Sequence, residues 1–247
     1  MLVKNSRGYY TFTSFSRFKN VVHGFSTRKF GDMRFKVSGN EGNREHLLKV
    51  LKAGQEYIFP QQVHDNKVAR VGKQESKKII PGVDGLISSD ENVTLMAVVA
   101  DCVPILFYDP AKTVIGVAHA GWRGTVAGIS KNLIKSMVKE FNSDPQNIIV
   151  GLGPCIEFCH YEVDQDRVNL ISEAGLEDMI LKNTSGKAFF DIKQANVKQL
   201  LGVGVLKDNI DVSVKMCTYE RNEFYSWRRE KPNVSGHFAG IIELKNG

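Results

Sequence analysis

The sequence predicts an α/β fold built as one domain with a mixed sheet. Three observations support this prediction. Apolar β-branched segments alternate with segments of helical spacing along the whole chain. The length of 247 residues falls within the range of one large α/β domain. No repeat, low-complexity tract or linker rich in Pro, Gly and Ser divides the chain. We therefore expect a single domain over residues 1–247.

The first elements alternate between strands and a helix. Residues 9–15 and 21–25 are rich in aromatic and β-branched side chains and predict two early strands. Residues 40–53 repeat apolar side chains at helical spacing and predict a helix. The side of this helix that faces the core would carry Leu47, Leu48, Val50 and Leu51.

The middle of the chain predicts a group of buried strands. A short strand is expected at residues 83–88, followed by apolar runs at 93–100, 105–108 and 114–118. These runs are β-branched and almost free of polar residues, which is typical of strands that are buried on both faces.

After His119 the apolar period changes from that of a strand to that of a helix. Residues 125–141 predict an amphipathic helix that begins just after the segment Gly121-Trp122-Arg123-Gly124. Free N–H groups at the start of a helix attract anions. The apolar positions of this helix are Val126, Ile129, Leu133, Ile134, Met137, Val138 and Phe141.

The last third of the chain continues the alternation. A strand is expected at residues 147–151, and two helices at 163–174 and 191–201. Residues 212–217 and 238–244 predict two closing strands.

Composition and charge exclude several classes of protein. Hydrophobic residues make up 42% of the chain and charged residues 24%, as in ordinary globular proteins. No apolar segment approaches the roughly 18–20 residues of a membrane span, and the N-terminus lacks the apolar core of a signal peptide. We expect a cytoplasmic protein without a membrane partner. The net charge of +6 comes from scattered lysines, so a nucleic-acid partner is not expected.

The most informative residues are one cysteine and two histidines. His64 ends the word Gln61-Gln62-Val63-His64, Cys102 lies between two apolar runs, and His119 follows 17 positions later. One thiolate and two imidazoles suit zinc, and three protein ligands leave a fourth position open for chemistry. The sequence therefore predicts a catalytic zinc site at His64, Cys102 and His119.

Charged residues near these ligands indicate what such a site could act on. Asp101 is a carboxylate at the end of a buried strand, where it could orient a histidine ligand or serve as a general acid or base. Arg123 offers a planar set of donors that suits phosphate. Residues 224–229 combine aromatic faces with Arg228 and Arg229, which suits a purine and an anion.

Three other functions fit the same residues. A cysteine hydrolase or amidase would use Cys102 as nucleophile and His119 as base. A copper oxidase would use the three ligands for copper, although 6 histidines are few for a multicopper enzyme. A structural zinc site would take a fourth ligand from Cys155, Cys159 or His160.

Several longer motifs resemble a known family across residues 23–229. The chain resembles the laccase-domain, or YfiH-type, family of purine nucleoside phosphorylases, polyphenol oxidases and peptidoglycan editing factors. The motifs that carry the resemblance are HGFSTR, QQVH, ADCVPILFYDP, AHAGWRGT, GLGPCIEFCHYEV, CTYE and FYSWRR.

The resemblance implies a four-layer α/β/β/α domain with zinc held by His64, Cys102 and His119. It implies phosphorolysis of adenosine, inosine and S-methyl-5'-thioadenosine, together with deamination of adenosine. The partners would be purine nucleosides and inorganic phosphate, and the chain would be a monomer or a weak dimer. The alternative activities are copper-dependent polyphenol oxidation and Cys–His hydrolysis in the editing of peptidoglycan precursors.

Residue roles follow from combining the motifs with this chemistry. Asp101 or Asp84 would move protons during deamination, and Arg123, with Arg28 or Arg228, would hold phosphate. Gln62 of the QQVH motif is assigned to substrate binding.

Two segments depart from the pattern of the family. Residues 31–42 lack its glycine-rich loop and Leu-Asn pair, and His237 stands where an arginine is common.

Overall fold

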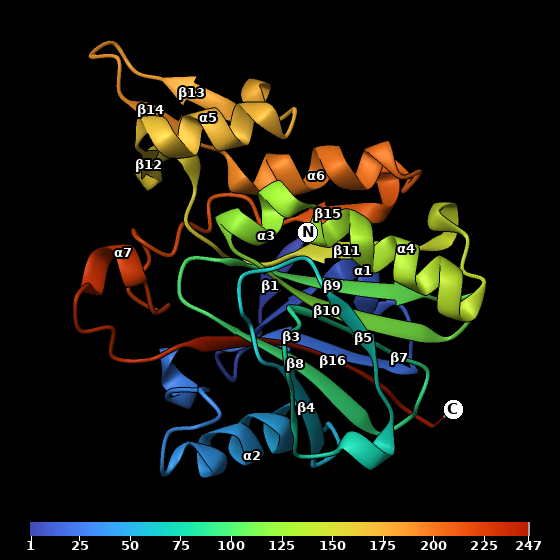
Figure 1. Ribbon diagram of the computed structural model, residues 1–247. Coiled ribbons are helices and arrows are strands. Elements are labelled where there is room, and N and C mark those ends of the chain that lie inside the picture. The colour runs from blue at the N-terminus through green and yellow to red at the C-terminus, as the bar shows by residue number, and fades with distance from the viewer. Residues whose placement is uncertain (247) are drawn as a thin grey trace.

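Two large β-sheets face each other, and helices cover both outer faces (Figure 1). The computed structural model describes residues 1–246. Helix α2 (Asn40–Leu51) covers the first sheet. The second sheet is covered by α3 (Trp122–Ala127), α4 (Ile129–Phe141) and α6 (Ile192–Gly202). The four-layer α/β/β/α architecture is therefore confirmed, and the one mixed sheet expected from the elements alone is instead two facing sheets.

The first sheet has seven strands, and the last strand of the chain lies in its middle. β16 pairs antiparallel with β3 on one side and with β8 on the other, so the C-terminal segment joins the early strands to the central ones. The order is β1 (Leu2–Lys4), β2 (Tyr10–Phe12), β3 (Val21–Phe25), β16 (Phe238–Leu244), β8 (Val93–Val99), β4 (Glu56–Pro60) and β6 (Ile79–Ile80).

The second sheet has six strands around an antiparallel pair that is buried along its whole length. Every residue of β9 and β10 is buried, as the apolar runs of the sequence predict. The order is β15 (Ile210–Val212), β11 (Ile149–Leu152), β9 (Val103–Asp109), β10 (Val114–Ala120), β7 (Gly85–Ser88) and β5 (Val68–Arg70).

A small third sheet lies beyond the helices of the second sheet (Figure 1). It consists of β12 (Glu162–Val163), β14 (Ala188–Phe190) and β13 (Ile180–Lys182), with α5 (Gln165–Glu173) beside it. No helix within residues 1–246 is long and apolar enough to span a bilayer.

Three clusters of buried apolar side chains fill the spaces between the sheets and the helices. The central one joins the two sheets, and the outer two seat the helices on them. The sheets approach closely where Gly151 of β11 meets the ring of Phe12, since a Cβ at Gly151 would lie 2.6 Å from that ring. Burial of so much apolar surface is the main stabilising contribution to the fold.

Several predicted elements have different bounds. The first strand ends at Phe12, and α1 (Thr13–Ser16) follows it. The helix predicted over 125–141 begins at Trp122 and is divided at Gly128, whose φ of +87° ends α3. The strand predicted over 212–217 is wrong, because β15 ends at Val212. The chain then forms a loop that leads to α7 (Trp227–Glu230).

Candidate metal centre and its cavity

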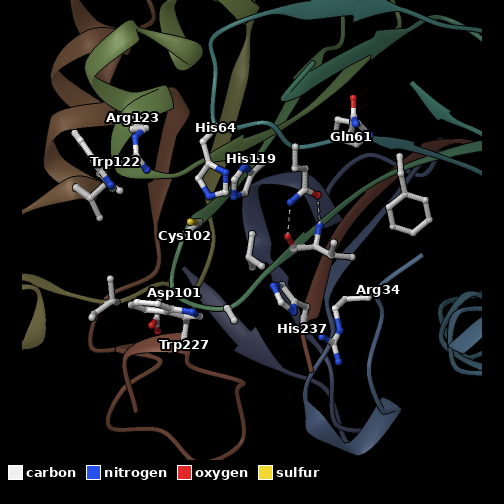
Figure 2. A pocket seen from close by; sticks show the side chains of 18 of the residues that line it. Arg34, Gln61, His64, Asp101, Cys102, His119, Trp122, Arg123, Trp227 and His237 are labelled. Carbon is white, nitrogen blue, oxygen red and sulfur yellow. Dashed lines mark hydrogen bonds between the residues drawn. The ribbon is translucent and has the colours of Figure 1, made fainter. Parts of the chain in front are cut away.

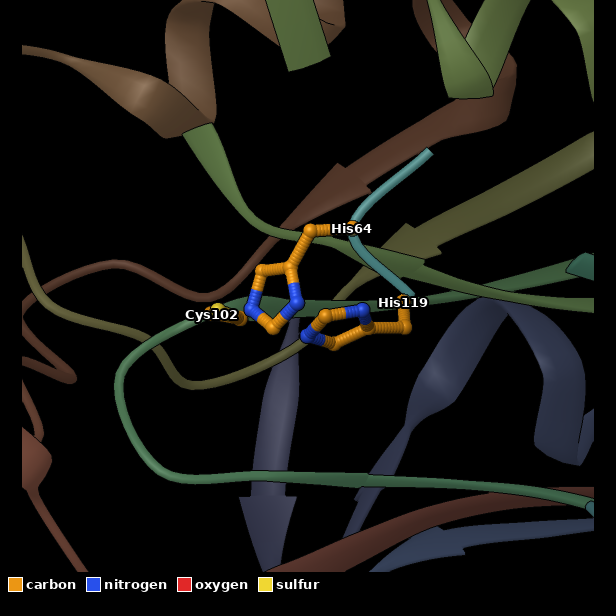
Figure 3. Close-up of side chains that lie close together, drawn as sticks. All are labelled: His64, Cys102 and His119. Carbon is orange, nitrogen blue, oxygen red and sulfur yellow. The ribbon is translucent and has the colours of Figure 1, made fainter. Parts of the chain in front are cut away.

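His64, Cys102 and His119 come together at one point of the fold. Their ligand atoms all lie within 4.8 Å of one another. His64 lies in the loop after β4, Cys102 in the turn between β8 and β9, and His119 near the end of β10. Figure 3 shows both imidazole rings and the sulfur turned toward one another. The three ligands predicted from the sequence thus form one cluster.

A buried carboxylate, Asp84, positions both histidines. Its Oδ1 accepts the Nδ1 proton of His119 at 2.7 Å and the backbone N–H of His64 at 3.0 Å. Its Oδ2 accepts the N–H groups of Val63 and Asp65 at 3.0 and 2.9 Å. With Nδ1 bound in this way, His119 keeps Nε2 for a ligand bond.

The hydrogen bonds keep Asp84 ionised although it is fully buried. Burial by itself would raise the pKa of Asp84. The bonds from His119 and from the backbone N–H groups of Asp65 and His64 outweigh it and lower the pKa below the ordinary value of 3.8. A carboxylate with this many donors is a fixed negative charge rather than a proton carrier.

The loop that carries His64 is held in an uncommon conformation. Gln62 and His64 have φ values of +61° and +64°, in the left-handed region that L-residues rarely adopt. The Gln62 amide forms two hydrogen bonds with the backbone of Val98, at 2.6 and 2.9 Å. The surrounding hydrogen bonds therefore maintain a strained loop that places the His64 ring.

Cys102 and His119 influence each other's protonation. Burial raises the pKa of Cys102, but the neighbouring His119 and His64 outweigh it and lower the pKa to about 7. Burial lowers the pKa of His119, whereas Cys102 and Asp84 outweigh it and raise the pKa to about 9. With a pKa of about 7, Cys102 is partly ionised at neutral pH, and the thiolate is the form that binds metals or attacks electrophiles.

Gly121 leaves space for the cluster. A Cβ at this position would lie 2.8 Å from Cδ2 of His64 and 3.1 Å from Sγ of Cys102. Any side chain here would displace two of the three ligands.

The cluster forms part of the wall of a cavity of about 660 Å³. Aromatic rings and guanidinium groups surround it (Figure 2). Arg123 and Trp122 lie on the side of His64, and Arg34 lies with His237 on the opposite side (Figure 2). The other aromatic and cationic residues of the wall are Phe35, Lys36, Phe59, Tyr161, Arg167, Trp227 and Arg228.

Asp101 lines the cavity but does not orient a histidine. Its carboxylate accepts hydrogen bonds of 2.6 Å from the Thr218 hydroxyl and from the backbone N–H of Arg228. Figure 2 shows it beside Trp227, away from His119. Burial raises the pKa of Asp101, and the hydrogen bonds from Thr218, Arg228 and Ser226 oppose the rise only in part. The positioning role expected for Asp101 therefore belongs to Asp84, which is not among the cavity-lining residues.

The predicted arginines separate into two groups. Arg123 and Arg228 line the cavity, whereas Arg28 does not. The Arg28 guanidinium contacts the Phe224 carbonyl, Ser235 and Glu230, so it serves to position the C-terminal loop. Gln62, predicted to bind substrate, does line the cavity, although its amide is hydrogen-bonded to the backbone of β8.

Arg34 and Arg167 are cavity residues that the sequence analysis missed. Arg34 lies in the segment after β3, and Arg167 lies on α5 with its guanidinium 5.4 Å from the Trp122 ring centroid. Neither belongs to a motif with a chemical signature. Arg167 is recognised as a cavity residue only by its contact with the Trp122 ring, which is remote from it in the sequence.

His237 contributes an imidazole ring to the cavity wall. The residue lines the cavity, and its buried Nδ1 has no hydrogen-bond partner in the part of the chain that the structure describes. Burial and the charge of Arg34 lower the pKa of His237 to about 4. The imidazole is therefore neutral near physiological pH, and its Nδ1 is enclosed by the protein.

The metal cluster has three protein donors and an open side. Within residues 1–246, no further His, Cys, Asp or Glu joins the set of His64, Cys102 and His119. Cys159 and His160, considered as a fourth ligand, belong to a separate cluster with Cys217. One sulfur and two imidazole nitrogens fit both zinc and copper, so the geometry indicates a metal without choosing between them.

The chain is similar to known proteins over most of its length. A family model described as "Multi-copper polyphenol oxidoreductase laccase" matches residues 18–245. The purine nucleoside phosphorylase YlmD of Bacillus subtilis (strain 168) is 31% identical, with 92% of this chain and 90% of that protein covered. An adenosine deaminase, RL5, from an unknown prokaryotic organism is 31% identical over 74% of each chain.

A solved structure shares the whole fold. The crystal structure of YlmD from Geobacillus stearothermophilus superposes with a TM-score of 0.91 and covers 99% of both chains at 29% sequence identity. The facing sheets and their helices are thus common to both proteins.

Proposed function

Because the chain belongs to the family described as multi-copper polyphenol oxidoreductase laccase, with relatives named purine nucleoside phosphorylase and adenosine deaminase, we propose that it is a zinc-dependent purine nucleoside enzyme. Its reactions are phosphorolysis of adenosine, inosine and S-methyl-5'-thioadenosine, and deamination of adenosine. Its partners are these nucleosides and inorganic phosphate.

One observation carries the proposal. The three-donor cluster of His64, Cys102 and His119 opens onto a cavity whose wall also holds guanidinium groups and aromatic rings. A nucleoside needs aromatic or apolar contacts for its base, and phosphate needs cationic donors. The cavity of about 660 Å³ lies within the size range of small-molecule sites.

The ligand set determines what a bound ion would contribute. A zinc ion held by these three residues would act as a Lewis acid and lower the pKa of water at the open position. Asp84 keeps the donors in place through its bonds to His119 and the His64 loop.

Asp101 is the proposed proton carrier for deamination. It accepts a proton from the water that attacks C6 of adenine and returns a proton to the departing amine. Its position in the cavity wall and its raised pKa support this role. Asp84, proposed for the same task from sequence, is fully buried with four donors and is left out of the proposal.

Phosphorolysis uses the cationic part of the wall. Phosphate attacks the anomeric carbon while the purine leaves, and Arg123 and Arg228 hold the phosphate. The guanidinium of Arg123 lies 4.5 Å from the Trp122 ring centroid, which orients it without using its donors. Arg28 is left out because its guanidinium is occupied by the C-terminal loop.

A Cys–His hydrolase is the second candidate function. The lowered pKa of Cys102, near His119, is typical of an activated nucleophile. A thiolate committed to zinc is a poor nucleophile, so the two functions exclude each other. An active, metal-free His64→Ala protein with hydrolase activity would favour this candidate, since a Cys–His pair works without His64.

A copper oxidase is the function suggested by the family description. The chain has 6 histidines, and the two clusters of potential ligands within residues 1–246 contain three of them. Several histidine-rich copper centres cannot be built from this set, so the multicopper arrangement of a laccase would not form. An absorbance scan of copper-loaded protein for the thiolate-to-copper band tests this alternative.

The proposal also places the enzyme in the cytoplasm. All four cysteines are free, and the metal-binding thiolate must stay reduced.

The decisive experiment is incubation of zinc-loaded protein with adenosine, with and without phosphate, followed by separation of the products. We expect adenine and ribose 1-phosphate with phosphate present, and inosine in both reactions. If no purine nucleoside yields either kind of product, the proposal fails.

A further inference from the structure

A second group of metal-binding side chains lies outside the site described above. The ligand atoms of Cys159, His160 and Cys217 all lie within 4.8 Å of one another. This cluster shares no residue with the first one. Cys159 is exposed, His160 is half-buried and Cys217 is fully buried, so the cluster extends from the surface into the fold.

We propose that Cys159, His160 and Cys217 form a second site that binds a zinc-type divalent cation. Two thiolates and an imidazole are the soft and borderline donors that select such ions over magnesium or calcium. Glu220 lies outside this cluster but next to two of its members, with its Oε1 3.6 Å from Nδ1 of His160 and 3.9 Å from Sγ of Cys159. The fourth position would therefore be filled by water or, after a side-chain rotation, by Glu220.

The distances agree with tetrahedral coordination. Bond lengths of about 2.3 Å to sulfur and about 2.0 Å to nitrogen place neighbouring S and N ligands about 3.5 Å apart. The Nδ1 of His160 lies 3.1 Å from Sγ of Cys159 and 3.7 Å from Sγ of Cys217. Both S–N separations are therefore within a few tenths of an ångström of those that zinc requires.

The surrounding contacts hold the donors in this arrangement. The His160 ring stacks on Tyr219 with centroids 4.4 Å apart and an angle of 19°, which fixes the direction of Nδ1. The backbone N–H of Glu157 donates to Sγ of Cys217 at 3.4 Å and so holds this sulfur in place. The site is largely formed by the protein itself.

The cation would join two loops that shape the catalytic cavity. Residues 155–161 supply Ile156 and Tyr161 to the cavity wall. The loop after β15 supplies Cys217 and also Thr218, whose hydroxyl binds Asp101. The loops already meet where the N–H of Thr218 donates to the Cys155 carbonyl at 2.9 Å. A metal at the second site therefore stabilises the position of the proton carrier without touching the substrate.

Cobalt binding to a Cys102→Ser protein tests the second site alone. This substitution removes the only thiolate of the first site, so thiolate-to-cobalt absorbance in the near ultraviolet reports on Cys159 and Cys217. We expect one equivalent of Co²⁺ per chain under reducing conditions. We also expect Zn²⁺ to displace the cobalt and to raise the Tm, because an ion that binds only the folded state stabilises it.

Two further substitutions, each added to the Cys102→Ser protein, act as test and matched control. Cys159→Ser removes an exposed ligand without disturbing the core, and should abolish the absorbance and the zinc-dependent rise in Tm. Cys155→Ala removes a neighbouring thiol that is not part of the cluster, and should leave both unchanged. His160→Gln provides a second ligand variant, with the same expected loss as Cys159→Ser.

Three results would overturn the proposal. They are absence of the absorbance in the Cys102→Ser protein, its persistence after Cys159→Ser or His160→Gln, and its loss after Cys155→Ala in a protein that stays folded. Every measurement here reports metal binding rather than turnover. A negative result would therefore overturn the second metal site without affecting the proposed nucleoside chemistry, which is tested separately.

Discussion

Asp84 and His119 form a buried pair in which the carboxylate Oδ1 accepts the Nδ1 proton of the ring at 2.7 Å. The same carboxylate receives three backbone N–H groups from the loop that carries His64. One side chain thus orients two of the three candidate metal ligands from two separate segments. The relative orientation of the two histidine ligands therefore depends on this carboxylate.

Asp84→Asn should weaken the metal site. The amide cannot accept all four hydrogen bonds as a carboxylate does, so the His64 loop and the His119 ring lose their orientation. Loss of such a partner typically lowers metal affinity about 10–100-fold. Zinc titration against a chromophoric chelator measures the change, with Asp65→Asn as control because its backbone, not its side chain, contacts Asp84. An unchanged affinity would contradict the positioning role.

Gly121→Ala should strongly reduce the amount of metal bound per chain and should change the Tm of the metal-free protein only slightly. The added Cβ would lie 2.8 Å from His64 and 3.1 Å from the sulfur of Cys102, so the ligands must move apart. Gly42→Ala in α2 is the matched control, since a Cβ there meets nothing within 4 Å. That change should raise stability by about 0.5–1 kcal/mol. Metal content by mass spectrometry and Tm by circular dichroism separate the two effects.

Asp101→Asn should reduce deamination while the metal stays bound. Loss of a proton carrier typically lowers kcat about 10²–10⁴-fold. In the folded protein the raised pKa keeps the carboxyl protonated to a higher pH than an ordinary aspartate. The ionised base is therefore lost, and kcat falls, as the pH drops through a value above 3.8. A pH profile of adenosine deamination should show this acid limb in the wild type and lack it in the variant; a limb retained in the variant would assign it to another group.

Arg123→Ala should affect phosphorolysis and spare deamination. The guanidinium lines the cavity and is the proposed phosphate ligand, whereas deamination needs no phosphate. We expect the KM for phosphate to rise about 10-fold or more, as for loss of a charge-assisted hydrogen bond. Arg70→Ala removes an arginine that does not line the cavity and should leave both reactions unchanged. Equal loss of both activities would point to a structural role for Arg123.

His237→Ala should raise the KM for nucleosides and change kcat little. The imidazole lines the cavity and has a pKa of about 4, so it can contact the substrate as a neutral group at any pH above that value. Loss of one neutral hydrogen bond corresponds to about a 2–10-fold change. His46→Ala, at an exposed histidine outside the cavity wall, is the control. Steady-state kinetics with adenosine and inosine would show whether the effect depends on the base.

The ligand set and much of the secondary structure could be predicted from local patterns. The runs that became β8, β9 and β10 are apolar enough to indicate burial without any knowledge of the partners. His64, Cys102 and His119 are unusual in their chemistry, so their motifs pointed to a common site before the fold was known. Their shared cluster agrees with that interpretation.

Residue roles that depend on contacts between distant segments could not be predicted in this way. Asp84 and Asp101 look equivalent in sequence, yet one is enclosed by four N–H donors and the other faces the cavity. Arg28 and Arg123 likewise differ only in what surrounds their guanidinium groups. The short strands β1, β5 and β6 carry too few residues for a periodic signal.

By itself, the sequence determined the class of the fold, the buried strands and the three candidate metal ligands, because each follows from side-chain chemistry or from short-range periodicity. Only the tertiary structure decided which carboxylate orients His119, which arginines reach the cavity, and that Cys217 lies beside Cys159, 58 positions earlier in the chain. These outcomes depend on strand pairings between remote segments, such as the insertion of β16 between β3 and β8. No local pattern encodes such pairings, since they arise from packing of the whole chain.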